Sequence, residues 1–96
     1  MDMEALMSQA QTLQNRIAAA QDALAQMQVR GIGGNGNVVV TMTGKYDVIS
    51  VVVQPGALES GAATVSQYVF DAYKDAKEKA DALIEKTMNE VTGTLE

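Results

Sequence analysis

The four glycines of residues 31–36, in RGIGGNG, are the first residues whose type and spacing could bind a ligand. Glycine-rich loops cradle phosphates with their backbone N–H groups. A dinucleotide site, however, needs G-x-G-x-x-G between a strand and a helix, and a P-loop ends in Lys-Ser or Lys-Thr. Here the glycines follow a helical pattern and precede a β-branched run, and no such Lys follows. The segment therefore predicts a short strand at residues 29–32 and a tight hairpin turn at residues 34–36, where Asn35-Gly36 supplies positive φ angles.

Groups for acid–base or nucleophilic catalysis are scarce in this sequence. It contains no His and no Cys, which removes the usual general base, the thiol nucleophile and the thiolate metal ligands. The acids of the second half instead lie four residues from lysines, in the pairs Lys74–Glu78, Lys77–Asp81, Asp75–Lys79 and Lys86–Glu90. Pairs at this spacing indicate a solvated helix face. We therefore expect a protein that is not an enzyme and that uses neither a cofactor nor a metal.

The first thirty residues carry the clearest structural pattern. Apolar residues recur at alternating spacings of three and four, which is a heptad seam: Met3, Leu6, Ala10, Leu13, Ile17, Ala20, Leu24 and Met27. Asp2 is placed to cap the start of the helix. A helix over residues 3–27 is about 37 Å long, which exceeds the width of a small globule. The seam must therefore pack against another long helix, from this chain or from a second one.

Two further strands are predicted at residues 37–43 and 46–53, where β-branched residues dominate. Residues 43–45, Thr-Gly-Lys, form the turn between them. The second of these strands is apolar on both faces, and a strand of that kind is normally covered on both faces. One helix from one small chain can cover only one face. The other face then needs helices from elsewhere or a second copy of the chain. The core is thin, with 4% aromatic residues, so we expect the second copy and hence a homodimer.

The second long helix is predicted to open at residues 64–67, TVSQ, which match the S/T-x-x-Q pattern of a capping box. Its apolar stripe continues to Val91, and Gly93 is a candidate C-cap. The order is thus long helix, three-stranded antiparallel sheet, long helix. We expect an α+β fold (α-β-β-β-α) that forms one domain over residues 1–96.

Charge and hydropathy restrict the partners. Twelve acidic and seven basic residues give a formal net charge of −5, which argues against a strong general affinity for nucleic acid. The acidic N-terminus does not resemble a signal peptide, and the longest apolar runs are too short to cross a bilayer. The first helix lacks the Lys/Arg-rich polar face of a membrane-surface helix. We expect a cytoplasmic protein without a membrane partner.

Several segments together resemble the YbaB/EbfC family of bacterial nucleoid-associated proteins. They are LMSQAQTLQNRI, VRGIGGNGNVVVTMTGKYDVISVVVQPGAL, DAYKDAKEKA and MNEVTGTL, in this order along nearly the whole chain. The resemblance implies a tweezer-like homodimer in which strands of two subunits pair and the long helices project as arms. It also implies largely sequence-nonspecific DNA binding in the nucleoid, with effects on nucleoid organisation and gene expression.

Seven cations are the candidate DNA contacts under this interpretation: Arg16, Arg30, Lys45, Lys74, Lys77, Lys79 and Lys86. The sequence departs from the family pattern because its first helix is poorly charged for contacting phosphate and because Lys74 stands where Asn is common. The helix-borne lysines could equally serve solubility through intrahelical pairs. An alternative from another class is a protein-interaction or scaffold dimer of the same fold, which grips a protein partner and binds DNA weakly or not at all.

Overall fold

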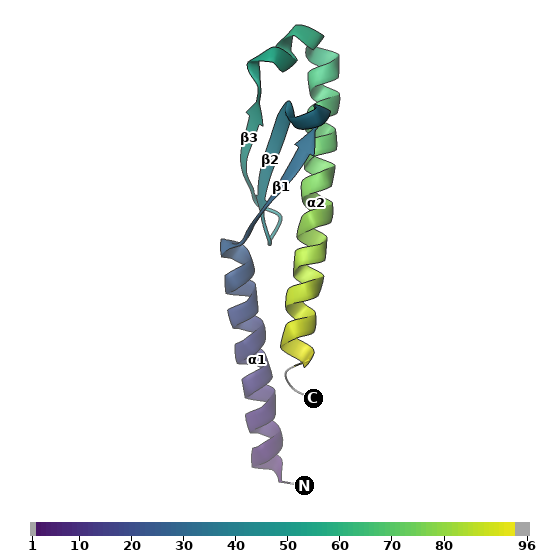
Figure 1. Cartoon of the computed structure of the whole chain (residues 1–96). Helices are drawn as coiled ribbons and strands as arrows, with labels where there is room; N and C mark the ends of the chain where they lie inside the picture. Colours follow the sequence, from purple (N-terminus) through teal and green to yellow (C-terminus); the bar gives the residue numbers. More distant parts are fainter. Residues whose placement is uncertain (1, 94–96) are drawn as a thin grey trace.

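The computed structural model describes residues 2–93, and its elements follow the predicted order of helix, three strands and helix (Figure 1). The elements are α1 (Met3–Gln26), β1 (Gln28–Gly33), the 3-10 turn η1 (Gly34–Gly36), β2 (Val38–Thr43), β3 (Val48–Val53), the 3-10 segment η2 (Pro55–Ser60) and α2 (Ala62–Gly93). The predicted α-β-β-β-α fold is therefore confirmed. In the described part of the chain, neither helix is long and apolar enough to span a membrane.

The three strands form one antiparallel sheet in the order β1-β2-β3. Gly33 pairs with Val38 across the first hairpin, and Val38 pairs in turn with Val53 of β3. A bulge on β3 interrupts the second ladder, because Thr41 pairs with Ser50 while the next residue of β2 pairs with Val48. The bulge leaves Ile49 as the extra residue and breaks the strict alternation that the sequence suggested for this strand.

Helix α2 packs against β1 and β2 at very short range (Figure 1). The core consists of Val38, Val40 and Met42 from β2 and of three alanines from the helix, Ala72, Ala76 and Ala80. A Cβ atom built on Gly31 would lie 1.9 Å from the carbonyl oxygen of Ala72, and one on Gly33 would lie 2.0 Å from that of Tyr68. The helix backbone therefore rests directly on β1, which only glycine permits at these two positions.

Helix α1 runs antiparallel to α2 and contacts it only with its C-terminal half (Figure 1). The Asp2 carboxylate accepts a hydrogen bond from the Glu4 N–H at 3.1 Å, as expected of an N-cap. Further along the seam Ala20 and Leu24 are buried, whereas Met3 is 69% exposed. The predicted seam is thus a packing surface over half of its length.

Strand β3 is largely exposed in the single chain, and only Val53 packs against the core cluster. Val48, Ile49, Val51 and Val52 each expose about half of their surface. The chain is also elongated, with principal extents of 68 × 18 × 15 Å and a radius of gyration of 19.0 Å, against about 12.5 Å for a compact domain of this length. Its accessible surface of 6528 Å² exceeds the roughly 5,300 Å² of a compact monomer of this mass.

Two local predictions need correction. The first hairpin is closed by four residues, 34–37, because Gly33 pairs with Val38. Gly34, Asn35 and Gly36 all have positive φ, so the glycines are needed as predicted, but the loop is one residue longer than the predicted turn at residues 34–36. Helix α2 begins at Ala62, two residues before the predicted capping box. Gly61, at φ 91°, ends η2, and its carbonyl accepts the N–H of Val65 in the first helical turn.

Candidate nucleic-acid interface

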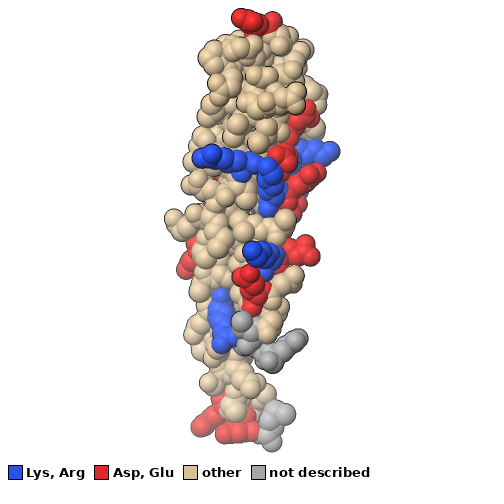
Figure 2. All heavy atoms as spheres, viewed as in Figure 1, with Lys and Arg blue, Asp and Glu red and all other residues tan. Residues whose placement is uncertain are grey.

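The seven candidate cations are all exposed, and they are spread along the whole molecule. Arg16 lies on α1, Arg30 on β1, Lys45 in the turn between β2 and β3, and the four remaining lysines on α2. Figure 2 shows Lys and Arg scattered along one face with Asp and Glu interspersed among them. The structure therefore brings together two small groups of these residues and forms no single basic patch on this face.

The first group joins α2 to the edge of the sheet at β1. Lys79 Nζ donates to the backbone carbonyl of Arg30 at 2.7 Å and lies 3.0 Å from a carboxylate oxygen of Asp75. The same carboxylate oxygen accepts the N–H of Ile32 at 2.9 Å, which satisfies a donor on the outer edge of β1. That hydrogen bond, assisted by Lys79, lowers the pKa of Asp75. Lys79 therefore holds the helix to the strand edge.

The second group surrounds the turn between β2 and β3. Tyr46, which has a positive φ of 68°, donates its phenolic O–H to the Asp81 carboxylate. This hydrogen bond is the main reason that the pKa of the tyrosine is raised. Lys77 Nζ lies 3.9 Å from the same carboxylate and 5.9 Å from the centre of the tyrosine ring. Lys45, the neighbour of Tyr46 in the chain, places a further cation in this turn.

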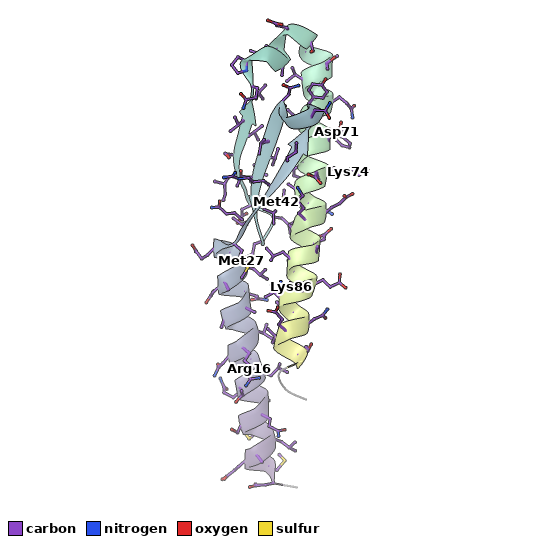
Figure 3. The ribbon with its side chains drawn as sticks, viewed as in Figure 1. Arg16, Met27, Met42, Asp71, Lys74 and Lys86 are labelled. Atoms are coloured by element: carbon purple, nitrogen blue, oxygen red, sulfur yellow. The ribbon has the colours of Figure 1, made fainter. Side chains whose placement is uncertain are left out.

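Lys74 and Lys86 differ from the other lysines of α2. The sequence paired them with Glu78 and Glu90, but within residues 2–93 no carboxylate lies within 4.0 Å of either ammonium group. Two of the four predicted intrahelical ion pairs are therefore formed and two are not. Figure 3 shows Lys74 at the level of the sheet and Lys86 nearer the end of α2. Their charges are available to an external anion.

Neither Arg16 nor Arg30 has an acidic residue four positions later in the sequence. Arg16 lies on the exposed stretch of α1, where it borders a shallow groove with Ala20, Glu90 and Val91 (Figure 3). Arg30 pairs with Thr41 in the ladder, and by strand alternation its side chain projects from the sheet face opposite α2. The two arginines therefore lie on separate elements and form no joint site.

Exposed aromatic residues beside the lysines are a feature that the sequence reasoning missed. Phe70 is 60% exposed and Tyr73 is 42% exposed, and Lys74 follows directly on the same helix. The signal was present in the alanine stripe, because Ala72 and Ala76 are the residues that face the sheet and so direct the aromatic residues outward. Aromatic rings beside cations are common where nucleic acids or proteins are bound.

The carboxylates of the described residues do not gather into one cluster. Within residues 2–93, no three acidic side chains converge closely enough to hold a metal ion. The two carboxylates with hydrogen-bond partners in other elements, Asp75 and Asp81, contact Ile32 and Tyr46 respectively. These groups stabilise the fold, so the surface cations remain the chemistry on offer to a partner.

Comparison with known proteins identifies the family of the chain and proteins with the same fold. The chain is 38% identical over 95 residues to a nucleoid-associated protein of Bradyrhizobium diazoefficiens, covering 98% of this chain and 90% of the relative. It is 36% identical over 94 residues to one of Gloeothece citriformis, covering 98% and 82%. An uncharacterised protein from Helicobacter pylori, solved by crystallography, has the same fold with a TM-score of 0.77 at 17% identity, over 100% of this chain and 99% of that one. The model of the YbaB/EbfC DNA-binding family matches residues 1–95, and the chain belongs to this family.

Proposed function

We propose that this protein is a single-domain homodimer that binds duplex DNA in the nucleoid with little sequence preference and without catalytic activity. The observation that carries the proposal is the family match over residues 1–95. Relatives named as nucleoid-associated proteins cover the same length and support a nucleoid-associated DNA-binding role. Such a role belongs to the cytoplasm, where the nucleoid lies, and includes effects on nucleoid organisation and gene expression.

The homodimer is supported by the open strand β3. Val51 and Val52 point to opposite faces of the sheet by strand alternation, and each is about half exposed. An apolar edge strand is a template for pairing with another chain. Burial of these side chains by a second copy would remove apolar area worth about 25 cal/mol per Å². Pairing through β3 leaves α1 and α2 free to project as the arms of a tweezer-like dimer.

DNA contact is proposed through the exposed candidate cations, which differ in how far a neighbouring carboxylate offsets their charge. Lys74 and Lys86 carry charges without a carboxylate partner among the described residues, and Lys45 and Arg30 project from the sheet end of the molecule. Lys77 contributes less, because Asp81 offsets its charge. Lys79 contributes less for the same reason, beside Asp75. Arg16 adds a cation on the α1 arm.

The acidic balance of the chain sets the expected strength of binding. A formal charge of −5 per chain gives a dimer of −10, so local cations must act against a repulsive net field. Binding should be weak and should fall steeply with salt, since release of condensed counterions drives it. These two properties form the signature that the experiment must find.

The test is fluorescence anisotropy of a labelled, sequence-neutral duplex titrated with the protein across a salt series. Lys74→Gln and Lys86→Gln should each weaken binding at low salt and reduce the log–log salt slope by about 0.9 for each phosphate that the variant no longer neutralises. Lys77→Gln is the matched control, with the same charge change on the same helix at a lysine already beside Asp81. Equal weakening in all three lysine variants would contradict the assignment of Lys74 and Lys86 as contacts. Unchanged binding by the double variant Arg16→Ala/Arg30→Ala would remove those two arginines from the proposed contacts.

A protein-interaction dimer with weak or no DNA binding is the second candidate function. It is favoured by the net charge of −5 and by exposed apolar side chains away from the sheet, such as Leu58 at 66%. No anisotropy change at low salt with a folded dimer would select it over DNA binding. A pull-down from nuclease-treated lysate should then retain protein partners that are not bridged by DNA.

A further inference from the structure

The N-terminal half of α1 carries an apolar seam that is exposed at Met3, Leu6 and Ala10 and half-buried at Leu13. We call residues 3–13 the α1 tip. Met3 is 69% exposed, Met7 68% and Leu6 43%. Helix α2 ends at Gly93, and near its end Val91 lies at the level of Arg16, so the tip projects beyond it (Figures 1 and 3).

The surface of the tip has a shape that suits another helix. The residues lining a shallow hollow on it, among those described, are Leu6, Ser8, Gln9, Ala10, Thr12 and Leu13. Ala10 is the smallest seam residue there and lies between the two leucines along the seam. A small residue flanked by large ones is the kind of hole into which a side chain of a facing helix inserts.

We propose that the α1 tip binds the α1 tip of a second copy of this chain, with the two helices antiparallel. The seam spacing carries the argument, because Met3, Leu6, Ala10 and Leu13 are separated by three, four and three residues. This series reads the same in both directions. Antiparallel helices centred on Ser8 therefore place Leu6 opposite Ala10 and Met3 opposite Leu13, so that the Leu6 knob of each chain meets the Ala10 hole of the other.

The charges of the tip favour the same orientation. Asp2 and Glu4 stand at one end, and Arg16 lies just beyond the other. In the antiparallel arrangement Asp2 of one chain and Arg16 of the second are offset by two residues, or about 3 Å along the helix axis. A parallel arrangement would instead place both acids of one chain against those of the other, which is repulsive.

The small size of the tip sets the strength of this contact. Eleven helical residues span about 15 Å, far less than a standard protein interface. The contact should therefore be weak and concentration-dependent, adding one association step to whatever the rest of the chain forms. A dimer with two tips could then link to further dimers, which would let separate DNA-bound dimers be joined.

Sedimentation equilibrium of the DNA-free protein over a concentration series tests the proposal. The double variant Leu6→Glu/Ala10→Glu should lower the association constant of the tip contact at least tenfold, so that at high concentration its mass is at most half that of the wild type. The matched control Ala5→Glu/Gln11→Glu adds the same charge to exposed positions off the seam and should behave as wild type. Because no DNA is present, the outcome is independent of DNA binding. The wild type should be at least twice as heavy as the variant whether the variant is a monomer, with one tip, or a dimer, with two.

Orientation is tested by disulfide trapping, since the chain has no native cysteine. Mixed Met3→Cys and Leu13→Cys variants should give mainly the 3–13 heterodimer under mild oxidation. A dominance of 3–3 and 13–13 products would overturn the antiparallel contact. Equal masses of the wild type and the Leu6/Ala10 variant at every concentration would overturn the contact altogether. If residues 94–96 of the same chain covered the tip instead, the masses of wild type and variant would also be equal. A chain truncated after Gly93 would then be less stable than the full chain.

Discussion

The two edges of the sheet are built in opposite ways. At the β1 edge, Gly31 and Gly33 admit the backbone of α2, and Asp75 satisfies the outward N–H of Ile32. At the β3 edge, valines and an isoleucine remain half exposed, and no helix of the described chain covers them. The β1 edge is covered by α2 of the same chain, which the glycines of β1 allow to approach closely. The other edge is apolar enough for a core, yet within residues 2–93 of the single chain no element covers it.

The largest expected effect is the disruption of the close approach at the first edge. Gly31→Ala would place a Cβ atom 1.9 Å from the carbonyl oxygen of Ala72 and 2.3 Å from the N atom of Ala76. Neither backbone atom can move without displacing the helix, so we expect the free energy of unfolding to fall by about 3 kcal/mol or more. Urea denaturation at fixed protein concentration measures it.

Gly56→Ala is the control for this substitution. Nothing lies within 4 Å of a Cβ built on Gly56, and the residue lacks a positive φ. Its alanine variant should stay within about 0.5 kcal/mol of the wild type. If both glycine variants unfolded at the same urea concentration, the close packing of this edge would not be a stabilising feature.

The second effect is expected at the open edge and concerns association. Val51→Lys and Val52→Lys, one on each face of β3, should each raise the dimer dissociation constant at least tenfold, because each buries a charge in the apolar contact. The free energy of unfolding of the monomer should change by no more than about 0.5 kcal/mol, since both positions are exposed in the single chain. Light scattering over a dilution series reports the mass.

Ala82→Lys, at an exposed site on α2, controls for the added charge. An effect of Val51→Lys without one of Val52→Lys would mean that a partner covers one face of β3. Undiminished association in both variants would contradict the proposed role of this strand.

The smallest effect belongs to the polar closure at Asp75. Its pKa is lowered first by the hydrogen bond from Ile32 and then by Lys79, so the folded state prefers the ionised form. The resulting stability is present above the unfolded pKa of about 3.9 and is lost as the pH falls through the folded value. Because the side chain is 36% exposed, Asp75→Asn should cost only about 1 kcal/mol at pH 7.

The pH dependence of stability shows whether the ionised Asp75 carboxylate, rather than the shape of the side chain alone, stabilises the fold. Thermal unfolding followed from pH 7 to pH 3 should show a shallower acid-side decline in Asp75→Asn than in the wild type. Glu78→Gln, at an exposed carboxylate of the same helix, should leave that decline unchanged. Parallel curves for the wild type and Asp75→Asn would mean that the carboxylate does not stabilise the strand edge.

The sequence predicted what depends on local pattern. The heptad seam and the β-branched runs indicated both helices and all three strands, and Asp2 was recognised as a cap. Patterns that depend on tertiary distances were less informative. The start of α2 follows from Gly61 rather than from the Thr64 motif, and the bulge at Ile49 has no sequence marker. The seam itself does not reveal that the described part of α2 reaches only to the level of Arg16 and does not extend along the α1 tip.

The candidate interface shows the same division. The i, i+4 rule identified the pairs formed by Lys77 and Lys79, because their partners are on the same helix. It could not predict that Lys79 also donates to the carbonyl of Arg30, or that Lys77 lies over the ring of Tyr46. Both contacts join segments more than thirty residues apart. Which lysines remain available therefore depended on the tertiary fold.

The junction between α1 and the sheet makes the first helix a lever. The N–H of Gly44 donates to the carbonyls of Leu24 and Met27, at 2.9 and 3.1 Å, so the turn after β2 grips the last turn of the helix. A side chain at Gly44 would collide with Leu24, so only glycine allows the turn to pack this closely against the end of α1. Over a helix of about 36 Å, a tilt of about 10° at the fulcrum displaces the far end by about 6 Å. A small change in backbone geometry at Gly44 would thus determine how far the N-terminal end of α1 lies from the sheet and from α2.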